Sequence, residues 1–473
     1  MTDEAIPLCV DLDRVLTPVD TLHESFLGLA RNAPWALVFL PLWVCRGQAQ
    51  MKRKLAVRAN LDVARLPLNP SLLKWLISER AAGRRLVLAT SADSGIANEI
   101  AARVSVFDEV LSSDGILNLS AGAMRRVLVQ RYGERGFDYV GNARADDKIW
   151  TSARKGIVVG DDHRVERARR FTEVERSFPA PGSSLLIWLR AIRVHQWTKN
   201  GLVFLPALLA HKIFQPSILR HAALAFVAFS LCASSIYLIN DLLDLPADRE
   251  HPRKRSRAFA AGQLSVRSGF FVSLALLCVA VYLALLVGQR FTLVLLGYYG
   301  LTWAYSLRLK RAALVDVITL AGLYTTRIIA GAAATATPLS FWLLAFSVFI
   351  FLSLGIVKRY AEISETPDTG AVRIHGRGYS ARDLPLLMNL GVASGYCTVV
   401  VMALYVNSSD ALLLYRHGKP LWLVCLLLLY WISRIWLFTA RGQMHEDPVV
   451  FALRDRVSLC VLAVLILIVL AAI

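Results

Sequence analysis

Nine long apolar runs occupy the chain from about Leu185 to its C-terminus and restrict its fold more than any other feature. They lie near 200–212, 218–240, 268–288, 291–306, 314–334, 339–357, 384–406, 420–438 and 452–473. A helix needs roughly 20 apolar residues to cross a bilayer, and each run approaches that length. We therefore expect an all-α polytopic membrane region of about nine transmembrane helices.

The residues before this region have the composition of an ordinary soluble domain. Hydrophobic residues make up 56% of the whole chain and are concentrated after Leu185. A charged stretch that ends in Phe178-Pro-Ala-Pro-Gly-Ser-Ser separates the two parts and is typical of a linker. We expect a soluble domain over 1–175, a linker over 176–184 and a membrane domain over 185–473.

The formal net charge of +18 comes from Lys and Arg residues in the breaks between apolar runs, without a single basic face. This pattern argues against nucleic acid as a partner and is typical of cytoplasmic loops that meet phosphates or lipid headgroups. We expect a bacterial-type inner (plasma) membrane protein whose N-terminal domain and active sites lie in the cytoplasm. We expect no cleavable signal peptide. The cysteines are not paired at zinc-binding or redox spacings.

An acidic motif follows the second apolar run, with Asn240, Asp244 and Asp248 spaced four residues apart and Asp241 beside the first. On a helix this spacing places the three side chains on one face, although Pro246 bends such a helix. Magnesium prefers carboxylate oxygens together with phosphate oxygens. The face formed by Asn240, Asp244 and Asp248 therefore predicts a site for Mg²⁺ and a diphosphate substrate.

Basic residues follow the acids, and Lys254 and Arg257 are placed to neutralise the charge of a departing pyrophosphate. The series Asn-Asp-x-x-Asp-x-x-x-Asp, then His-Pro, a Lys/Arg cluster and Ala261–Ser265, resembles the first aspartate-rich motif of UbiA-superfamily transferases. The resemblance implies a helix bundle with a central cavity open to the cytoplasm and to lipid. It also implies that the acids of the motif are catalytic, namely Asp241, Asp244 and Asp248.

The place of a second aspartate-rich motif separates branches of this superfamily. Aromatic prenyltransferases carry Asp-x-x-x-Asp there, whereas this chain has Lys358, Arg359 and Glu362. Other segments resemble the branch typified by decaprenyl-phosphate phosphoribosyltransferase, namely His195–Asn200, Tyr305–Lys310, Asp316-Val, Arg327–Gly331 and Arg441–Pro448. In that branch a polyprenyl phosphate attacks the anomeric carbon of phosphoribosyl pyrophosphate, and magnesium-bound pyrophosphate leaves.

The nucleophile of such a reaction is already an anionic phosphate, so positioning and charge neutralisation suffice. Candidates for binding the lipid phosphate or the ribose 5-phosphate are charged residues near helix ends, namely Lys199, Lys358, Arg359 and Arg441, with Glu362 beside two of them. For each cation the alternative is a side chain that extends from a helix to the membrane interface. Asp316 and Arg327 lie within or near an apolar helix, where they either form structural pairs or line the cavity.

A short apolar run at the start of the chain, Ile6–Val10, predicts a buried strand that leads directly into Asp11 and Asp13. Two aspartates at i and i+2 after a strand resemble the first motif of haloacid-dehalogenase-type (HAD) phosphatases. The resemblance implies a Rossmann-like α/β domain in which Asp11 is the nucleophile and Asp13 the acid/base, both bearing on a Mg²⁺ ion. A phosphoaspartate divides a difficult hydrolysis into two easier steps.

Two further motifs of the HAD family have counterparts in this domain. An apolar run ends in Thr90 and Ser91, where the family binds the phosphoryl group. Gly141–Asp147 resembles the family's metal motif, so that Asp146 completes the Mg²⁺ site, and Gly160–Asp162 is the rival placement.

The lysine of the HAD third motif is missing where it is expected, around Asn118 to Arg126. Arg125 or Arg126 could supply its charge, although arginine and lysine differ in reach and geometry. The alternative is a degenerate phosphatase-like domain with a scaffolding role.

Residues 17–83 are long enough for a small helical cap inserted after the first strand. Within them, Ala33–Val44 is apolar but too short to span a bilayer. This segment forms either the core of the cap or a surface that rests on the membrane beside a lipid-linked substrate.

Together these features predict a bifunctional membrane enzyme of cell-envelope biosynthesis, with Mg²⁺ in both domains. The membrane domain would transfer 5-phosphoribose from phosphoribosyl pyrophosphate to a decaprenyl-type polyprenyl phosphate, and the soluble domain would remove the 5-phosphate. The alternative is a UbiA-type prenyltransferase that moves an isoprenoid from its diphosphate to a small acceptor, with a regulatory or inactive N-terminal domain.

Overall fold

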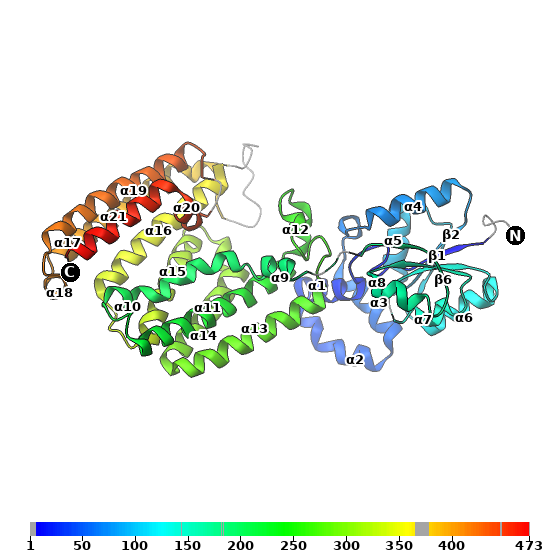
Figure 1. The fold of residues 1–473 in the computed structure, drawn as a ribbon. Helices are drawn as coiled ribbons and strands as arrows, with labels where there is room; N and C mark the ends of the chain where they lie inside the picture. The colour runs from blue at the N-terminus through cyan, green and yellow to red at the C-terminus, as the bar shows by residue number, and fades with distance from the viewer. Residues whose placement is uncertain are drawn as a thin grey trace. The chain divides into compact units, whose positions relative to one another are not determined.

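The computed structural model describes residues 6–142, 144–180, 182, 184–364, 378–444 and 447–472. The chain divides into two compact units, whose elements are labelled in Figure 1. One unit, called the sheet unit, consists of residues 1–192 and 237–273. The other, called the helical unit, consists of residues 193–236 and 274–473.

A six-stranded parallel sheet forms the centre of the sheet unit. Its strands are β1 (Leu8–Val10), β2 (Leu86–Asp93), β3 (Glu109–Ser113), β4 (Asp138–Gly141), β5 (Lys155–Val159) and β6 (Glu173–Phe178). The order β3-β2-β1-β4-β5-β6 places β1 between β2 and β4, with Leu8 opposite both Leu86 and Asp138. The expected N-terminal α/β region and its first buried strand are confirmed.

Helices fill the long connection from β1 to β2, where we expected an insertion. They are α1 (Thr21–Asn32), η2 (Pro34–Phe39), α2 (Leu40–Cys45), α3 (Gln48–Ala59), η3 (Val63–Arg65) and α4 (Pro70–Ala81). Asp20 and Asn69 cap α1 and α4 through side-chain oxygens that accept backbone N–H bonds. The later connections carry α5 (Ser94–Val104), α6 (Ala121–Tyr132), α7 (Asp147–Trp150) and α8 (Asp162–Ala168).

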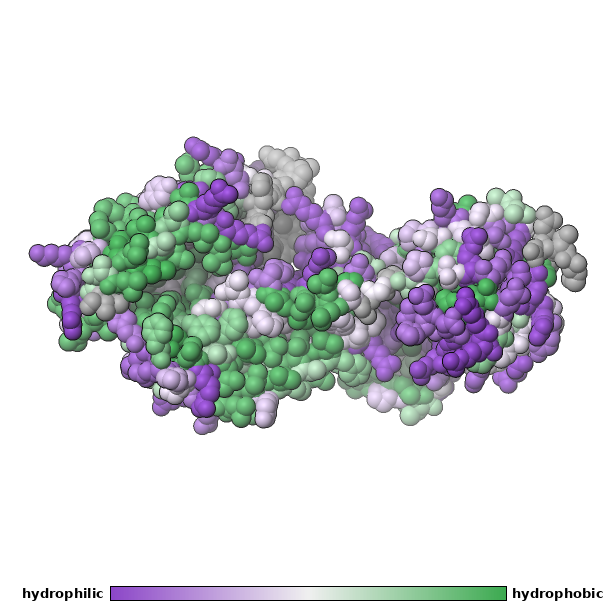
Figure 2. Space-filling model, viewed as in Figure 1, coloured by the Kyte–Doolittle hydropathy of each residue, from purple (hydrophilic) through white to green (hydrophobic). Residues whose placement is uncertain are grey.

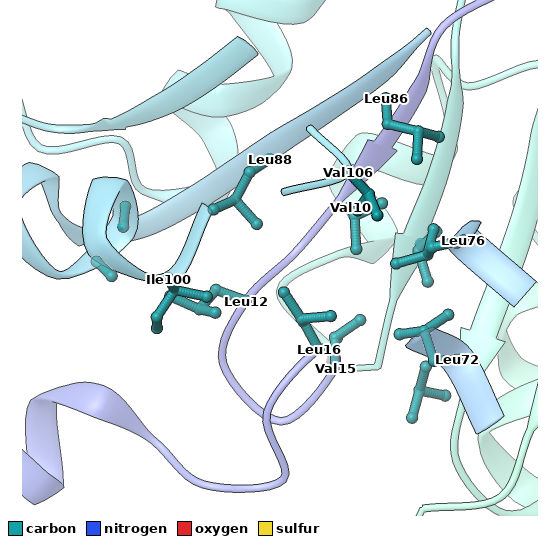
Figure 3. Packing of buried hydrophobic residues seen from close by; sticks show 14 of the residues in the cluster. Val10, Leu12, Val15, Leu16, Leu72, Leu76, Leu86, Leu88, Ile100 and Val106 are labelled. Atoms are coloured by element: carbon teal, nitrogen blue, oxygen red, sulfur yellow. The ribbon is translucent and has the colours of Figure 1, made fainter. Parts of the chain in front are cut away.

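Hydrophobic cores lie on both faces of the sheet, because side chains alternate along a strand. Leu8 and Val10 of β1 belong to one core, and Cys9 between them belongs to the other. Figure 3 shows how Leu12 and Leu16, from the loop after β1, lie among the side chains of the first core. The loop that carries Asp11 and Asp13 is thereby fixed by its apolar neighbours.

The C-terminal region contains, among the described residues, six helices long and apolar enough to cross a membrane, or seven if one bent pair counts as a span. The six include α11 (Pro216–Leu243), α13 (Val266–Val287), α15 (Val315–Thr335), α16 (Phe341–Ser364), α17 (Leu384–Val406) and α19 (Trp422–Ala440). The bent pair is α20 (Pro448–Arg454) and α21 (Arg456–Ala472), at 78°. Hydrophobic residues cover much of the surface formed by these helices, as a lipid-facing surface requires (Figure 2).

The expected count of about nine spans is not confirmed in the described part of the chain. The run near 200–212 forms a 3-10 helix, η4 (Val194–Phe204), and the short α10 (Leu205–Leu209), which has Pro206 in its first turn. The run near 291–306 does form a helix, α14 (Gln289–Leu307). Polar residues at its start and its tyrosines and glycines make it less apolar than the spanning helices.

Residues 237–273 belong to the same compact unit as the N-terminal residues, and they contact the helical insertion there through α1 and η3. This segment holds the end of α11, α12 (Leu245–Glu250), η5 (Lys254–Ser256) and the start of α13. Gly262 has a φ of +70°, and a Cβ there would lie 2.6 Å from Pro18 in the loop after β1. The compact units do not coincide with the domains expected from the sequence. The predicted domain bounds of 1–175, 176–184 and 185–473 therefore remain a prediction.

Candidate functional site

The first candidate site lies at the carboxyl ends of β1, β2 and β4. Because these strands are parallel neighbours, Asp11 after β1, Thr90 in β2 and Asp146 after β4 reach the same edge of the sheet. The N–H of Asp11 donates to the carbonyl of Val140 at 3.1 Å, and the Asp146 carboxylate accepts from the N–H of Asn142 at 2.8 Å. The structure thus brings three predicted residues together.

The carboxyl groups at this edge crowd one another. Burial raises the pKa of Asp11 well above its usual value, and the charges of Asp146 and Asp13 raise it further. Hydrogen bonds from the next backbone N–H, at 2.7 Å, and from the Thr90 hydroxyl oppose that rise. Burial also raises the pKa of Asp13 to about 6, although the N–H of Thr21 donates to its carboxylate at 2.7 Å. A cation here would relieve the repulsion.

Lys52 of α3, which was not predicted from the sequence, reaches this site from the helical insertion. Its Nζ donates to the carbonyl of Ser91 at 2.7 Å and to Oδ1 of Asn118 at 2.9 Å. Lys52, Asp13 and Asp20 line a cavity of about 110 Å³. Burial lowers the pKa of Lys52 against the opposing charges of the nearby aspartates. No motif marks this lysine, because its position depends on how α3 packs beside β2.

Two other candidates are engaged elsewhere in the sheet unit. Arg125 on α6 donates from Nε to Oγ of Ser152 at 2.6 Å, so its guanidinium is directed toward that side chain. Asp161, from the rival metal motif, caps α8 by accepting from the N–H of Arg164 at 3.2 Å. Arg125 and Asp161 are thus engaged by other partners, whereas Lys52 and Asp146 both lie near enough to Asp11 to interact with its charge.

The acidic motif forms a second candidate site at the junction of α11 and α12. Helix α11 ends at Leu243, and α12 begins at Leu245 with Pro246 in its first turn. Helical hydrogen bonding nevertheless continues across the junction. The backbone N–H of Asp244 donates to the backbone carbonyl of Asn240 at 2.9 Å. The backbone N–H of Asp248 donates to the backbone carbonyl of Asp244, also at 2.9 Å.

Arg257 joins two acids of this motif. Its Nη1 lies 3.1 Å from Oδ1 of Asp241 and 2.8 Å from Oδ2 of Asp248, and both carboxylates are buried. These acids are about two helical turns apart and therefore share a face. The predicted face of Asn240, Asp244 and Asp248 differs from this pairing, because Asp244 is exposed and Asp241 is turned toward Arg257.

The acidic motif is also tied to α1 of the same unit. Arg249 of α12 donates to both carboxylate oxygens of Glu24, at 2.6 and 3.1 Å, and to the carbonyl of Ala260 at 3.3 Å. The side chains of Arg249 and Glu24 are 6% and 4% exposed. Removing one partner of such a pair leaves a buried charge uncompensated, so this contact fixes α12 against α1. No sequence motif connects these two residues.

Magnesium fits the donor chemistry at both sites, although no cluster of ligands is already assembled. Across the described ranges, no three His, Cys, Asp or Glu side chains form a group that could hold a metal ion. Mg²⁺ usually binds through only one or two carboxylates together with substrate phosphates and water. The paired acids Asp241 and Asp248, and the crowded acids Asp11 and Asp146, match that mode.

A third polar group lies in the helical unit and is centred on Asp447. Its Oδ2 is 2.7 Å from Nζ of Lys199 and 3.3 Å from Nζ of Lys358. Lys199 is buried, with its Nζ 5.9 Å from the centre of the Tyr324 ring. Burial alone would raise the pKa of Asp447, but the two lysines lower it to about 2. Two predicted phosphate-binding lysines are thus joined by Asp447, which belongs to the Arg441–Pro448 segment of the resemblance but was not itself a predicted site residue.

Arg327 is buried beside polar and aromatic side chains. Its Nε donates to Oδ1 of Asn200 at 2.9 Å, and its guanidinium lies 5.2 Å from the centre of the Tyr298 ring. These contacts hold Arg327 between Asn200 and the aromatic rings. The predicted cations Lys254 and Arg441 are both exposed.

Asp316 is likewise held in a buried pair. Its Oδ2 lies 2.6 Å from Nη2 of Arg359, and its Oδ1 accepts from the hydroxyl of Tyr379 at 2.5 Å. Arg359 also pairs with Glu362. Arg359 and Glu362 are therefore joined in a charged group that holds α15 and α16 together, which is the structural alternative for Asp316.

The model of the UbiA prenyltransferase family matches residues 202–471, more than half of this sequence. The chain belongs to that family. The match contains the whole acidic motif, Arg257, Arg327, Lys358 and Asp447, whereas Lys199 lies just before it. The UbiA resemblance of the acidic motif is thereby confirmed.

Relatives of this UbiA-family chain differ in how much of it they match. Uncharacterized protein y4nM of Sinorhizobium fredii is 37% identical over 461 residues, which are 96% of this chain and 89% of the relative. Nodulation protein NoeC of Azorhizobium caulinodans is 35% identical over 59% of this chain and 90% of its own length. Decaprenyl-phosphate phosphoribosyltransferase of Mycobacterium tuberculosis is 33% identical over 57% of this chain and 88% of its own length. The matched residues lie in the C-terminal part of this chain.

The Asp447 group gives a stability prediction for the UbiA-family region. The drop in the pKa of Asp447 from 3.8 to about 2 corresponds to about 2 kcal/mol of stability at neutral pH. Because the folded-state pKa is depressed, this contribution is present above pH about 4 and is lost as pH falls toward 2. Asp447→Asn should lower the thermal midpoint in detergent at pH 7, whereas the exposed control Asp410→Asn should not. Equal midpoints would contradict the assignment.

Proposed function

We propose that this UbiA-family protein transfers 5-phosphoribose from phosphoribosyl pyrophosphate to a polyprenyl phosphate and then removes the 5-phosphate. The transfer half is carried by the sequence identity with relatives named decaprenyl-phosphate phosphoribosyltransferase. In aromatic prenyltransferases, a second aspartate-rich motif would bind the prenyl diphosphate. This chain has Lys358, Arg359 and Glu362 at that place, which supports phosphoribose transfer over prenyl transfer. Both sites face the cytoplasm of a bacterial inner membrane in this proposal.

In the transfer step, a phosphate oxygen of the lipid attacks the anomeric carbon, and the bond from that carbon to the pyrophosphate oxygen breaks. The electron pair leaves with pyrophosphate. Arg257 neutralises the leaving group, because its guanidinium already lies within hydrogen-bonding distance of two carboxylates and can exchange one for a phosphate oxygen. Lys199 and Lys358, which share Asp447, bind the lipid phosphate or the ribose 5-phosphate.

Asn240, Asp244 and Asp248 remain the predicted Mg²⁺ ligands of this step, and Asp241 is a further candidate because it shares Arg257 with Asp248. When bound, Mg²⁺ supplies positive charge that stabilises the diphosphate as a leaving group. Asp241 of α11 and Asp248 of α12 both pair with Arg257, so this guanidinium positions the two carboxylates relative to each other.

In the second step, Asp11 attacks the phosphorus of the 5-phosphate, and the bond from phosphorus to the ribose oxygen breaks. Asp13 gives a proton to that oxygen and later takes one from the water that hydrolyses the phosphoaspartate. Thr90 and Lys52 hold the phosphoryl oxygens at the end of β2. The products are inorganic phosphate and a lipid-linked ribose, while Asp11, Asp13 and Asp146 would hold the Mg²⁺ of this site.

Contacts within the sheet unit support a link between the two steps. Arg249, next to Asp248, is fixed to Glu24 of α1, and Thr21 at the start of α1 donates to Asp13. One short helix therefore contacts both the acidic motif and the phosphatase-like residues. The Sinorhizobium fredii relative spans 96% of this chain, so the combination of both parts recurs in another protein.

The transfer is tested with purified full-length protein, a polyprenyl phosphate and phosphoribosyl pyrophosphate labelled in the ribose. We expect label to move into the lipid fraction in a Mg²⁺-dependent reaction. A folded protein that gives no lipid-soluble label would contradict the transfer step. Transfer of label from a prenyl diphosphate to a small acceptor would instead support the prenyltransferase alternative.

Lys52 gives a specific prediction for the phosphatase step. Lys52→Ala should lower phosphate release roughly 10²-fold, because a cation within reach of the phosphoryl group stabilises charge in the transition state. Lys54→Ala is the matched control, since Lys54 lies on the same helix but 5.9 Å from the centre of the Trp43 ring. Equal activity of the two variants would show that Lys52 is not part of the site.

A further inference from the structure

An apolar face is exposed on the helical insertion after β1, over Pro34–Cys45. This segment buries Ala36 and Trp43 against its neighbours. Its outward side chains are exposed, and we call them the α2 face: Trp35, Val38, Phe39, Leu42 and Val44. Val38 is 79% exposed and Trp35 is 66% exposed. Hydrophobic residues gather in Figure 2 at the place where Figure 1 labels α2.

The charge around the α2 face has one sign. Residues 25–61 contain no Asp or Glu. Lys52 and Arg53 are directed elsewhere, to the cavity beside Asp13 and to Asp93, whereas Lys54 and Arg58 lie over the ring of Trp43. Arg46, directly after α2, and Arg58 of α3 are exposed. The guanidinium of Arg58 lies 5.1 Å from the centre of the Trp43 ring, so this cation borders the apolar segment. A complementary surface must therefore be both apolar and anionic.

We propose that the α2 face lies in the headgroup region of an anionic lipid bilayer. A short helix with Trp, Phe and Leu on one side and Lys or Arg beside them has the composition of an interfacial membrane segment. The chain carries its own membrane-spanning helices, so this face is tethered near lipid and needs little affinity of its own. A second copy of the face is disfavoured as the partner, because like charges would oppose each other.

This docking places a functional helix near the lipid surface. Helix α3 packs on α2, and the same helix carries Lys52 into the cavity beside Asp13. A phosphate group at the membrane surface would then be close to the cations of α3. The inference concerns lipid contact and does not depend on the proposed phosphatase activity.

The test uses full-length protein in lipid nanodiscs, with a fluorescent label on a single introduced cysteine. Val38→Cys reports on the α2 face, and Ile116→Cys is the matched control because Ile116 is exposed on a loop of the same unit. The exposed native cysteines are first replaced by serine, namely Cys45, Cys278, Cys397 and Cys460. Each variant must keep the thermal midpoint of the unlabelled protein.

In discs that contain phosphatidylglycerol, we expect lipid-borne nitroxide to quench the label at position 38 several-fold more than the label at position 116. Iodide dissolved in the water should quench the label at position 116 more strongly than the label at position 38. Equal iodide quenching at both positions would overturn the proposal. A label at 38 that is shielded from iodide but not quenched by lipid nitroxide would also overturn it, since protein would then cover the face.

Hydrogen exchange provides a measurement on the native sequence, without substitutions. Amides of residues 34–45 should exchange several-fold more slowly in discs of phosphatidylcholine with phosphatidylglycerol than in phosphatidylcholine alone. Amides of the control segment around Ile116 should exchange at the same rate in both. Equal rates for residues 34–45 in the two lipids would contradict the anionic part of the proposal.

Discussion

Replacing Asp248 with Asn should nearly abolish transfer of labelled ribose to the lipid. Asp248 is buried, 2.8 Å from Arg257, on the face it shares with Asp241. The substitution removes a negative charge that would help to hold Mg²⁺ and leaves Arg257 with a weaker partner. We expect a loss of roughly 10²- to 10³-fold, the size seen when a preorganised electrostatic contact to a transition state is lost. The measurement is the initial rate of lipid labelling.

The matched control is Glu250→Gln on the same short helix. Glu250 is exposed and pairs with Arg65, so its charge lies outside the acidic group around Arg257. This variant should keep most of the transfer activity. The Asp248→Asn protein should also keep its phosphatase activity, which would show that the sheet unit is still folded. Transfer near the wild-type rate in Asp248→Asn would exclude this acid from the site.

Replacing Asp11 with Asn should abolish phosphate release and leave ribose transfer intact. Asp11 is the proposed nucleophile, and an amide cannot form the phosphoaspartate. Loss of a nucleophile typically costs on the order of 10⁴-fold or more. The phosphate released from the lipid-linked 5-phosphoribose is the quantity to measure. A scaffolding domain, the alternative to an active phosphatase, predicts no change on this substitution.

Asp161→Asn is the control for the phosphatase site. Asp161 belongs to the rival metal motif, but it caps α8 through the N–H of Arg164. This substitution should cost at most about 1 kcal/mol of stability through the lost charge at the cap, with phosphate release unchanged. If Asp161→Asn abolished release while Asp146→Asn did not, the rival motif would hold the metal.

Local patterns were sufficient to predict the parts of the fold that depend on sequence neighbours. The run Ile6–Val10 became β1, and the apolar run from 218 to 240 became α11. Parallel pairing then brought Asp11, Thr90 and Asp146, which were identified through the HAD resemblance, to one edge of the sheet. The count of spanning helices was harder, because Pro206 and the tyrosines of α14 change length and hydropathy without ending the apolar pattern.

Contacts between distant segments could not be predicted in the same way. Lys52 reaches Ser91 only because α3 packs beside β2, and Arg249 reaches Glu24 across 225 residues of sequence. The i, i+4 rule selected Asn240, Asp244 and Asp248, but Asp244 is exposed and Arg257 joins Asp248 to Asp241. These features depend on tertiary packing, which spacing along the chain does not contain.

In the proposed function, one chain makes a lipid-linked phosphoribose and then dephosphorylates it. Phosphoribosyl pyrophosphate carrying tritium in the ribose and phosphorus-32 in the 5-phosphate tests both steps at once. Wild-type protein should place tritium in the lipid and release phosphorus-32 as inorganic phosphate, and Asp11→Asn should retain both labels in the lipid. Absence of tritium from the lipid would contradict the transfer step, and retention of both labels by the wild type would contradict the phosphatase step.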